Sequence, residues 1–568
     1  MANGKQQMNE IEAKKIFNEA QKNFENLNYE KARELWLKIL RFYPENLSLL
    51  RNISLTYFNQ ANFFETENIL KKIIKINLKE TNALNMLILV LEEQDKIEEA
   101  KKFIDIGINN NLLNDHWKIK KELLIPMIKN DSDEIIKFRS NINKFIEEIL
   151  SNQNDYKFNI NDHLIKPPQF GLSYDQFDNL AINKKCVTLF RKIYPELNKI
   201  YLHKNTPSNK VKLGFISEYF TDHTIGKLFK GIILEIDKKK FEVFVFHTEQ
   251  TRKGSILDDL INAENKGIIK NIFLPKDFRQ KQVSILDQKL DILFYPEIGL
   301  SLQLYFLSYI RLAKYQVTSW GHPETTGNGS IDYFISSKLI ESENSNKNFS
   351  EKLICSESLP MFYYKPEVKN ILSAEKINKT NLYSCPQTLF KLHPDFDQII
   401  EKIQKEDKNS IFYFIKDSNK AFNNIFINRL KNNPKINTDR IQLLETMNWE
   451  EYINHCGRAS VLLDPLYFGA GNSFYESMIY GTPTVTMPTN YTKSRLVLGA
   501  YNQMNISDIK FNPIVKDINS YVNQAVEIAN DKNLIELKYQ LKSKAENNLY
   551  ENKKSISDLE NIFDKIVN

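Results

Sequence analysis

Small side chains recur at a fixed spacing near the start of the chain. Ala32, Thr66 and Ala100 lie 34 residues apart, and each opens a stretch with apolar residues at helical spacing. Those apolar residues are Leu35, Ile39 and Leu40, then Ile69, Ile73 and Ile74, then Phe103, Ile104 and Ile108. Helical units of this length cannot bury an apolar face alone, so they stack on one another. The spacing predicts an α-helical solenoid over residues 1–125, with a generic helical bundle as the alternative.

The 34-residue period is that of tetratricopeptide repeats. Pro44 follows the first stretch as that motif expects, whereas the next two copies lack the proline. Stacked repeats of this kind present a concave surface that binds peptides or other proteins. We therefore expect a polypeptide partner for residues 1–125.

Residues 126–208 carry helical patterns that polar and proline-rich stretches interrupt. Asp133–Leu150 and Asp178–Ile193 read as helices, residues 152–161 are polar, and Lys166-Pro167-Pro168 marks a break. This pattern predicts a helical adaptor that packs the repeats onto the remainder of the chain.

Strand and helix patterns alternate from Lys210 onward, which predicts parallel α/β sheets. A first lobe over residues 209–368 has strands expected at Val211–Ile216, Phe241–His247, Asn271–Leu274, Asp291–Tyr295, Tyr315–Trp320, Tyr333–Ser336 and Leu353–Leu359. A hinge is expected at residues 365–380. The second lobe, over residues 369–568, has strands expected at Asn381–Cys385, Ser410–Ile415, Arg440–Leu444, Val461–Leu463 and Thr484–Met487. Ligands of such sheets bind at the carboxyl ends of the strands.

Composition excludes several classes of protein. The chain has 568 residues and a net charge of +6, too small for its length to indicate a nucleic-acid partner. The N-terminus has no signal-peptide pattern, and no apolar run is long enough to span a bilayer. Four scattered cysteines without a CxxC pair are typical of a reducing compartment, so we expect a cytoplasmic protein. The eight histidines form no HxxxH or HxH cluster, and no metal site is expected.

Leu462–Pro488 reads as a strand, a glycine-containing loop, a helix start and a second strand. The glycines would let the backbone approach a ligand, and Asn472 and Ser473 occupy positions typical of a helix N-cap. Such a turn favours phosphate binding. Glu476, one turn further, could accept hydrogen bonds from a ribose diol. An ordinary βα turn with a solvent-facing glutamate is the alternative.

Two residues of the first lobe are candidates for proton transfer. His223 and Glu297 each follow an expected strand, and both side chains can accept a proton. Each could instead be a surface residue. In the second lobe, Gln387 and Lys391 follow the strand Asn381–Cys385. A lysine beside a departing diphosphate would offset its developing charge, and a surface lysine is the alternative.

The run Asp464–Ser473, with Tyr475-Glu476 and Gly481–Pro488, resembles the signature of glycosyltransferase family 41, which holds the protein O-GlcNAc transferases and SPINDLY-type proteins. The resemblance covers roughly residues 165–568 and implies a GT-B architecture of two Rossmann-like lobes. It implies a donor-binding set of Gln387, Lys391, Gly471, Asn472, Ser473, Glu476 and the loop residue His322. The predicted catalytic residues are His223, which matches the family's proposed base, Glu297 and Lys391.

The expected function is therefore that of an inverting protein O-glycosyltransferase. The resemblance favours UDP-GlcNAc as the co-substrate, Ser or Thr of a polypeptide as the acceptor, and no metal cofactor. O-fucosyl or N-glucosyl transfer on the same fold stays open, because Trp449 and Tyr452 stand where O-GlcNAc transferases often have a lysine and a histidine. The alternative from another class is a non-catalytic tetratricopeptide scaffold with a decayed transferase fold.

Overall fold

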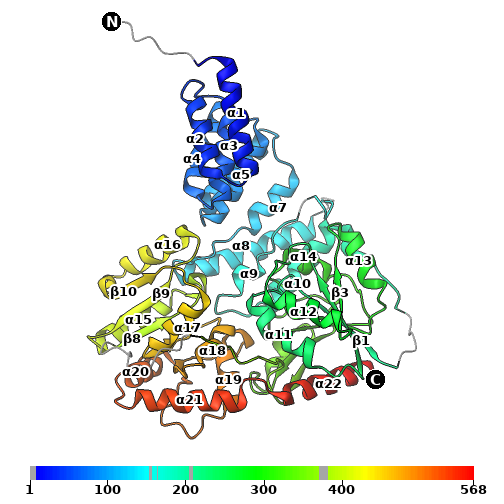
Figure 1. Ribbon diagram of the computed structural model, residues 1–568, viewed down its shortest axis with the longest axis vertical. Coiled ribbons are helices and arrows are strands. Elements are labelled where there is room, and N and C mark those ends of the chain that lie inside the picture. Colours follow the sequence, from blue (N-terminus) through cyan, green and yellow to red (C-terminus); the bar gives the residue numbers. More distant parts are fainter. Residues whose placement is uncertain (1–7, 153–155, 163, 204–208, 370–380) are drawn as a thin grey trace. The chain divides into compact units, whose positions relative to one another are not determined.

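The computed structural model describes residues 8–152, 156–162, 164–203, 209–369 and 381–568 (Figure 1). The chain divides into two compact units. Of the described residues, those up to Met127 and those from Ser418 to Ile425 form the first, and the others form the second. The predicted hinge at 365–380 falls mainly on residues 370–380, outside the described residues, as do residues 153–155 of the predicted polar loop.

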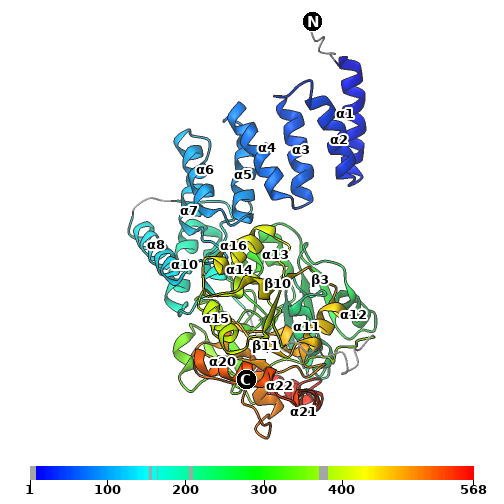
Figure 2. The ribbon, with the colours of Figure 1, turned by 90° about the vertical axis from the view of Figure 1, so that its left-hand side faces the viewer.

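The first unit is a stack of paired helices. Figure 2 shows them following one another along the stack. They are α1 (Glu10–Glu25), α2 (Tyr29–Leu40), α3 (Leu47–Asn59), α4 (Phe63–Ile76), α5 (Thr81–Glu93), α6 (Ile97–Asn109) and α7 (Asp115–Leu123). Helices α2, α4 and α6 carry Ala32, Thr66 and Ala100, and all three of these side chains are fully buried. The predicted solenoid is confirmed, and each period contains two helices.

A left-handed residue ends the first helix of each pair. Leu27, Ala61 and Asp95 have φ values of 60°, 53° and 57°. The N–H of the residue after each one bonds back to the helix, as in Asn62 N–H to the Tyr57 carbonyl at 2.9 Å. This is the Schellman arrangement, which satisfies helix carbonyls that would otherwise lack partners. The turn recurs with the sequence period.

The second unit begins with helices and continues into a seven-stranded parallel sheet. Its strand order is β3-β2-β1-β4-β5-β6-β7. The strands are β1 (Val211–Ile216), β2 (Phe241–His247), β3 (Lys270–Phe273), β4 (Ile292–Tyr295), β5 (Tyr315–Ser319), β6 (Tyr333–Ser337) and β7 (Lys352–Ser356). The helices are α8 (Ser132–Ser151), α9 (Gln169–Leu172), α10 (Leu180–Ile193), α11 (Thr224–Glu235), α12 (Ser255–Asn265), α13 (Phe278–Leu286) and α14 (Leu302–Leu307). The order reverses between β1 and β4, which makes that position the topological switch point.

A second parallel sheet has five strands in the order β10-β9-β8-β11-β12. The strands are β8 (Leu382–Cys385), β9 (Ile411–Ile415), β10 (Ile441–Leu444), β11 (Val461–Leu463) and β12 (Thr484–Val485). The helices are α15 (Phe396–Glu406), α16 (Lys420–Lys431), α17 (Trp449–Arg458), α18 (Asn472–Ser477), α19 (Leu496–Met504), α20 (Ile518–Ala529) and α21 (Leu534–Asn548). The switch point here lies between β8 and β11. Each strand expected from the sequence is present within a few residues, and the two-lobed α/β fold is confirmed.

The last helix, α22 (Lys553–Val567), packs on the first sheet (Figure 1). The Phe563 ring lies 6.2 Å from Phe241 of β2 and 6.0 Å from Phe294 of β4, measured between ring centroids. Glu560 accepts a hydrogen bond from the Asp237 N–H at 2.8 Å. The chain therefore returns from the second lobe to complete the apolar packing of the first.

Candidate functional site

The switch point of the second sheet joins two loops through hydrogen bonds. Gln387 and Lys391 follow β8, and Ser473 stands at the start of α18, after β11. The Lys391 ammonium donates to Gln387 Oε1 at 2.9 Å, and Gln387 Nε2 donates to Ser473 Oγ. Three of the predicted donor-binding residues thus lie together. The arrangement places one cation at the carboxyl ends of two adjacent strands, where open α/β sheets bind ligands.

Burial dominates the electrostatics of Lys391. It lowers the pKa of the ammonium to about 8, against the opposing effect of the nearby Asp464 carboxyl. The ammonium also lies 5.1 Å from the ring centroid of Phe468. A nearby anion would stabilise the charged form of this lysine, because it compensates for the hydration that the ammonium loses on burial.

Asp464 shapes the glycine loop, a role that the sequence analysis did not assign. Its Oδ1 accepts the Ala470 N–H at 2.6 Å, and its Oδ2 accepts the Thr486 hydroxyl at 2.7 Å. A Cβ on Gly469 would come within 3.0 Å of this carboxyl, so a larger residue there would push the Asp464 side chain from its place. Burial raises the pKa of Asp464 to about 7. Its position directly after β11 was the available signal.

The start of α18 differs from the expectation. Gly471 occupies the N-cap, and Asn472 and Ser473 belong to the first turn of the helix, so neither caps it. Asn472 Oδ1 instead accepts the Tyr363 hydroxyl at 2.7 Å. A Cβ on Gly471 would meet only Leu496, at 3.7 Å. Among the described residues, space is therefore left open in front of Gly471, as close approach of a ligand requires.

Glu476 is buried and already hydrogen-bonded. Its Oε1 accepts from the Lys227 ammonium at 2.6 Å and from the Trp449 indole N–H at 2.8 Å. Lys227 belongs to α11 of the first lobe, whereas Trp449 begins α17 of the second. A ribose diol would have to share or replace these donors. Lys227 was not predicted as a site residue; its place one turn after His223 was the only signal.

The same three side chains line a cavity of about 580 Å³. The other lining residues include Asp222, Lys230, Ser255, Tyr363, Tyr364 and Lys365. Both lobes contribute, because α11 and α17 reach it from the two sheets. Pockets of a few hundred cubic ångströms are typical of small-molecule sites. The carboxylate of Glu476 is therefore part of the wall of a pocket between the lobes.

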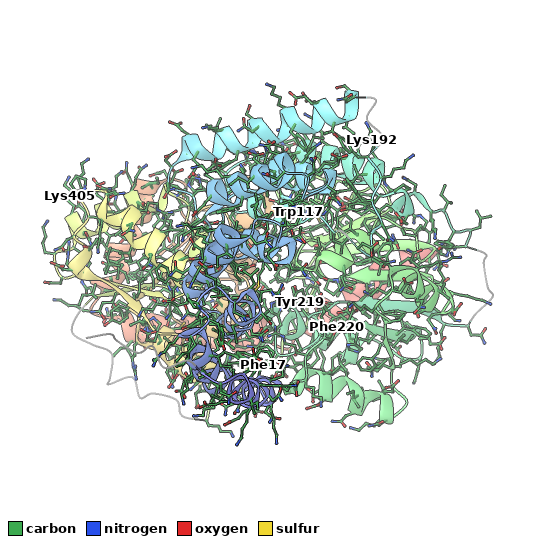
Figure 3. All side chains as sticks on the ribbon, turned by 90° about the horizontal axis from the view of Figure 1, so that it is seen from above. Phe17, Trp117, Lys192, Tyr219, Phe220 and Lys405 are labelled. Carbon is green, nitrogen blue, oxygen red and sulfur yellow. The ribbon has the colours of Figure 1, made fainter. Side chains whose placement is uncertain are left out.

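His223 lies at the switch point of the first sheet, as the N-cap of α11. Its Nδ1 accepts the Ile225 N–H at 3.3 Å, and its ring centroid lies 4.5 Å from that of Tyr219, with the two rings tilted by 30°. Tyr219 follows β1 next to Phe220 (Figure 3). Burial, aided by the charge of Lys227, lowers the pKa of His223 to about 4. The neutral ring accepts at Nδ1, so its proton resides on Nε2. His223 therefore offers a hydrogen-bond donor at that atom.

Glu297 follows β4, beside the end of β1, and no hydrogen bond joins it to His223 among the described residues. It is 1% exposed and accepts the Ser217 hydroxyl at 3.0 Å. Burial raises the pKa of Glu297 well above its usual range, despite this hydrogen bond. A carboxyl with a raised pKa is the stronger base of the two candidates, but it is the less accessible one.

His322 is buried among aromatic side chains beside the loop that follows β11. Its Nε2 lies 3.2 Å from Ser173 Oγ, and its ring stacks on Phe170 at 6.1 Å. The Phe468 ring, which Lys391 approaches, lies 6.2 Å from the His322 ring. Burial lowers the pKa of His322 to about 4, so the ring is neutral near pH 7.

The chain begins with a helical-repeat solenoid and continues into two parallel α/β sheets. The switch points of the two sheets face one another through Lys227 and Glu476. This is the architecture of a GT-B glycosyltransferase fold with tetratricopeptide repeats. Among solved structures, a mutant of the Thermobaculum terrenum O-GlcNAc transferase superposes with a TM-score of 0.71 at 15% identity, covering 98% of this chain and 97% of that protein. In the described residues, no helix has the length and apolar character of a membrane span. No protein-family model matches the chain.

Sequence similarity to known proteins supports the same assignment. A probable UDP-N-acetylglucosamine–peptide N-acetylglucosaminyltransferase SPINDLY of Hordeum vulgare is 21% identical over 368 residues, 61% of this chain and 37% of that protein. A UDP-glucose:protein N-beta-glucosyltransferase of Actinobacillus pleuropneumoniae serotype 5b (strain L20) is 23% identical over 245 residues, 42% of this chain and 38% of that protein. The chain thus spans less than two fifths of the length of these relatives. The chain is SPINDLY-like in sequence and O-GlcNAc transferase-like in fold, as its motifs indicated.

Proposed function

We propose that the protein transfers a sugar from a nucleoside diphosphate donor to a polypeptide. The observation that carries the proposal is the hydrogen-bonded chain from Lys391 through Gln387 to Ser473 at the second switch point. A cation there, with open space at Gly471, suits a diphosphate. The curated relatives, which are named as peptide or protein glycosyltransferases, support the same reaction class.

The proposed reaction is a single displacement at C1 of the sugar. The acceptor atom attacks C1 from the face opposite the diphosphate, and the bond between C1 and the phosphate oxygen breaks. The bonding electrons leave with the diphosphate, and the proton of the acceptor passes to a base. Lys391 is already protonated below its pKa of about 8 and offsets the charge that develops on the leaving group. Inversion of the sugar's anomeric configuration follows from the single displacement.

The donor is proposed to be UDP-GlcNAc and the acceptor a Ser or Thr hydroxyl. The name of the Hordeum relative supports this choice, while the Actinobacillus relative favours glucose transfer to a protein nitrogen as the second candidate. Glu476 would hold the ribose after exchanging the Lys227 ammonium for a sugar hydroxyl. His322 and Gly471 would form the donor-side wall.

The two candidate bases give different pH profiles. His223 can take a proton only if Nδ1 releases the Ile225 N–H, and its pKa of about 4 would leave the rate flat through neutral pH. Glu297 would instead give a rate that rises with pH near its raised pKa. The pH dependence of kcat/KM in wild type and in His223→Asn separates the two roles.

The first experiment is a thermal-shift titration with UDP, GDP, UDP-GlcNAc, UDP-glucose and GDP-fucose, followed by transfer assays on peptides. Saturating ligand at about 100 times its Kd adds roughly 2.7 kcal/mol to folded-state stability. Lys391→Met should lose the shift, and Lys405→Met, an exposed lysine on α15 (Figure 3), should keep it. If none of the nucleotides stabilises the wild-type protein, the transferase proposal fails and the scaffold alternative gains.

A further inference from the structure

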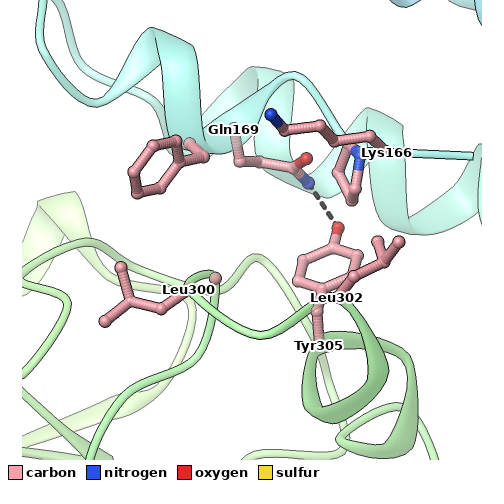
Figure 4. Close-up of a pocket in the computed structure, with 8 residues that line it drawn as sticks. Lys166, Gln169, Leu300, Leu302 and Tyr305 are labelled. Carbon is pink, nitrogen blue, oxygen red and sulfur yellow. Dashed lines mark hydrogen bonds between the residues drawn. The ribbon is translucent and has the colours of Figure 1, made fainter. Parts of the chain in front are cut away.

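A second, smaller cavity lies between α9 and the loop that leads into α14. Its volume is about 170 Å³, and its walls are mainly apolar: Pro167, Phe170, Leu300 and Leu302 (Figure 4). The first two precede or form α9, and the other two flank the start of α14. None of the predicted site residues lines it. An engineered cavity of about 150 Å³ accepts benzene, so this one has room for a single six-membered ring.

One polar side chain in the cavity wall is incompletely satisfied. Gln169 is only 6% exposed, and its Nε2 donates to the Tyr305 hydroxyl, as Figure 4 shows. Its Oε1 has no hydrogen-bond partner among the described residues. The Tyr305 oxygen also accepts the Tyr309 hydroxyl at 2.8 Å. Turning the Gln169 amide over would satisfy Oε1 but leave Nε2 unpaired, so one amide atom needs a partner in either orientation.

A hydroxyl group fits this requirement best. It can donate to an amide oxygen or accept from an amide nitrogen, so it pairs with Gln169 in both orientations. The apolar walls and the ring-sized volume favour a hydroxyl that is carried by an aromatic ring. The ligand class is therefore a phenol. At the rim, the exposed Lys166 ammonium adds a positive charge.

The cavity adjoins the switch point of the first sheet. Gly299 and Leu300 line it and follow Glu297 after a single intervening residue. The Leu300 carbonyl accepts the Tyr219 hydroxyl at 3.2 Å, and the Tyr219 ring contacts the His223 ring. On the other wall, Phe170 stacks on His322. A side chain held here would anchor its polypeptide beside the groups that face the acceptor.

We propose that this cavity binds the side chain of a tyrosine in the polypeptide acceptor, with Gln169 recognising the phenolic hydroxyl. The Lys166 ammonium favours an acidic residue next to that tyrosine. That the polypeptide is an acceptor rests on the proposed transferase function. The binding of a phenol ring does not, so the two can fail separately.

The direct test uses p-cresol as the probe and toluene as its matched control, with ligand-observed NMR on the full chain. We expect p-cresol to bind about 5- to 10-fold more tightly than toluene, because only the phenol pairs with Gln169. Gln169→Met should bring the two affinities together, and Leu302→Trp should abolish both by filling the ring space. Equal affinities in wild type, or unchanged p-cresol binding in Leu302→Trp, would overturn the proposal.

Folding of the variants is checked by their melting temperatures, with Leu302→Ala as a variant that leaves the cavity open and should retain p-cresol binding. A second arm compares sugar transfer to Ser peptides that carry Tyr or Phe at one scanned position. We expect a Tyr preference of about 5- to 10-fold in kcat/KM that disappears in Gln169→Met. Selective p-cresol binding without any transfer would leave the cavity assignment intact and defeat the transferase; transfer without p-cresol binding or a Tyr preference would defeat only this inference.

Discussion

The predicted catalytic residues at the ends of the two sheets differ in charge. At the second switch point, Lys391 has a pKa of about 8 and is mainly charged near pH 7. At the first, His223 has a pKa of about 4 and is neutral, and burial raises the pKa of Glu297 toward its neutral form. Apart from the Lys227–Glu476 ion pair, the predicted catalytic residue at the second switch point is thus a cation, and the two at the first are uncharged. This difference matches an anionic leaving group on one side and a neutral acceptor on the other.

Removal of the Lys391 cation is the test of this difference with the largest expected effect. Lys391→Met should lower kcat about 100- to 1,000-fold, because the charge that offsets the departing diphosphate is lost. Lys391→Arg should recover part of the rate, and Lys405→Met should leave it unchanged. Steady-state transfer kinetics measure the effect. A Lys391→Met enzyme with a near-normal kcat would show that the second switch point does not hold the leaving group.

The pH dependence of nucleotide binding tests the charge itself. On the proposed function, a diphosphate would bind the protonated form of Lys391, whose pKa without ligand is about 8. Affinity should therefore be full below that pKa and fall up to about tenfold per pH unit above it. Calorimetric titration of UDP at about pH 7 and about pH 9.5 measures this fall in affinity. Lys391→Arg should bind UDP equally well at both pH values. A fall in affinity that persists in this variant would have to come from another titrating group.

The Lys227–Glu476 ion pair determines whether the two switch points are coupled. Lys227→Met leaves the buried Glu476 carboxylate with the Trp449 donor and without its cation. Because the lysine is 28% exposed, we expect a loss of about 2 kcal/mol in unfolding free energy, less than for a fully buried pair. Urea unfolding measures it. Lys227→Met with Glu476→Gln should be more stable than the two separate losses predict; simple additivity would mean that the pair contributes no coupling.

The smallest effect concerns the helix that carries His223. His223→Ala removes the side-chain cap of α11 and should destabilise the protein by about 1 kcal/mol. His223→Asn supplies another N-cap and should retain the stability while losing the imidazole. Thermal unfolding of both variants measures the difference. Equal stability of the two would show that Nδ1 does not cap the helix, which would free it to act as a base.

The sequence predicted the fold and the positions of the site loops, because both depend on local patterns. The 34-residue period located α2, α4 and α6, and strand ends placed Gln387, Lys391 and His223 at the two switch points. The contact between Lys227 and Glu476 could not be predicted, since these residues lie 249 positions apart and belong to different lobes.

Backbone geometry explains the other differences between the predicted and the observed site. Gly471 takes the N-cap of α18 because Asn472 is held in the first turn, where it bonds to Tyr363. Asp464 supports the glycine loop through Ala470 and Thr486, a contact that joins residues 22 positions apart. Neither arrangement has a signature in residue type alone. Both depend on how the loop after β11 folds back onto its neighbours.

The return of α22 to the first sheet has a consequence for the order in which the chain is made. Residues 553–567 emerge from the ribosome after the whole second lobe, yet Phe563 packs against Phe241 and Phe294. The first lobe therefore cannot complete its packing during its own synthesis, although domains generally fold as they emerge. Until α22 arrives, part of its sheet is uncovered. The two lobes are tied into one folding event, and a nascent chain arrested before Lys553 should bind chaperones through its first lobe.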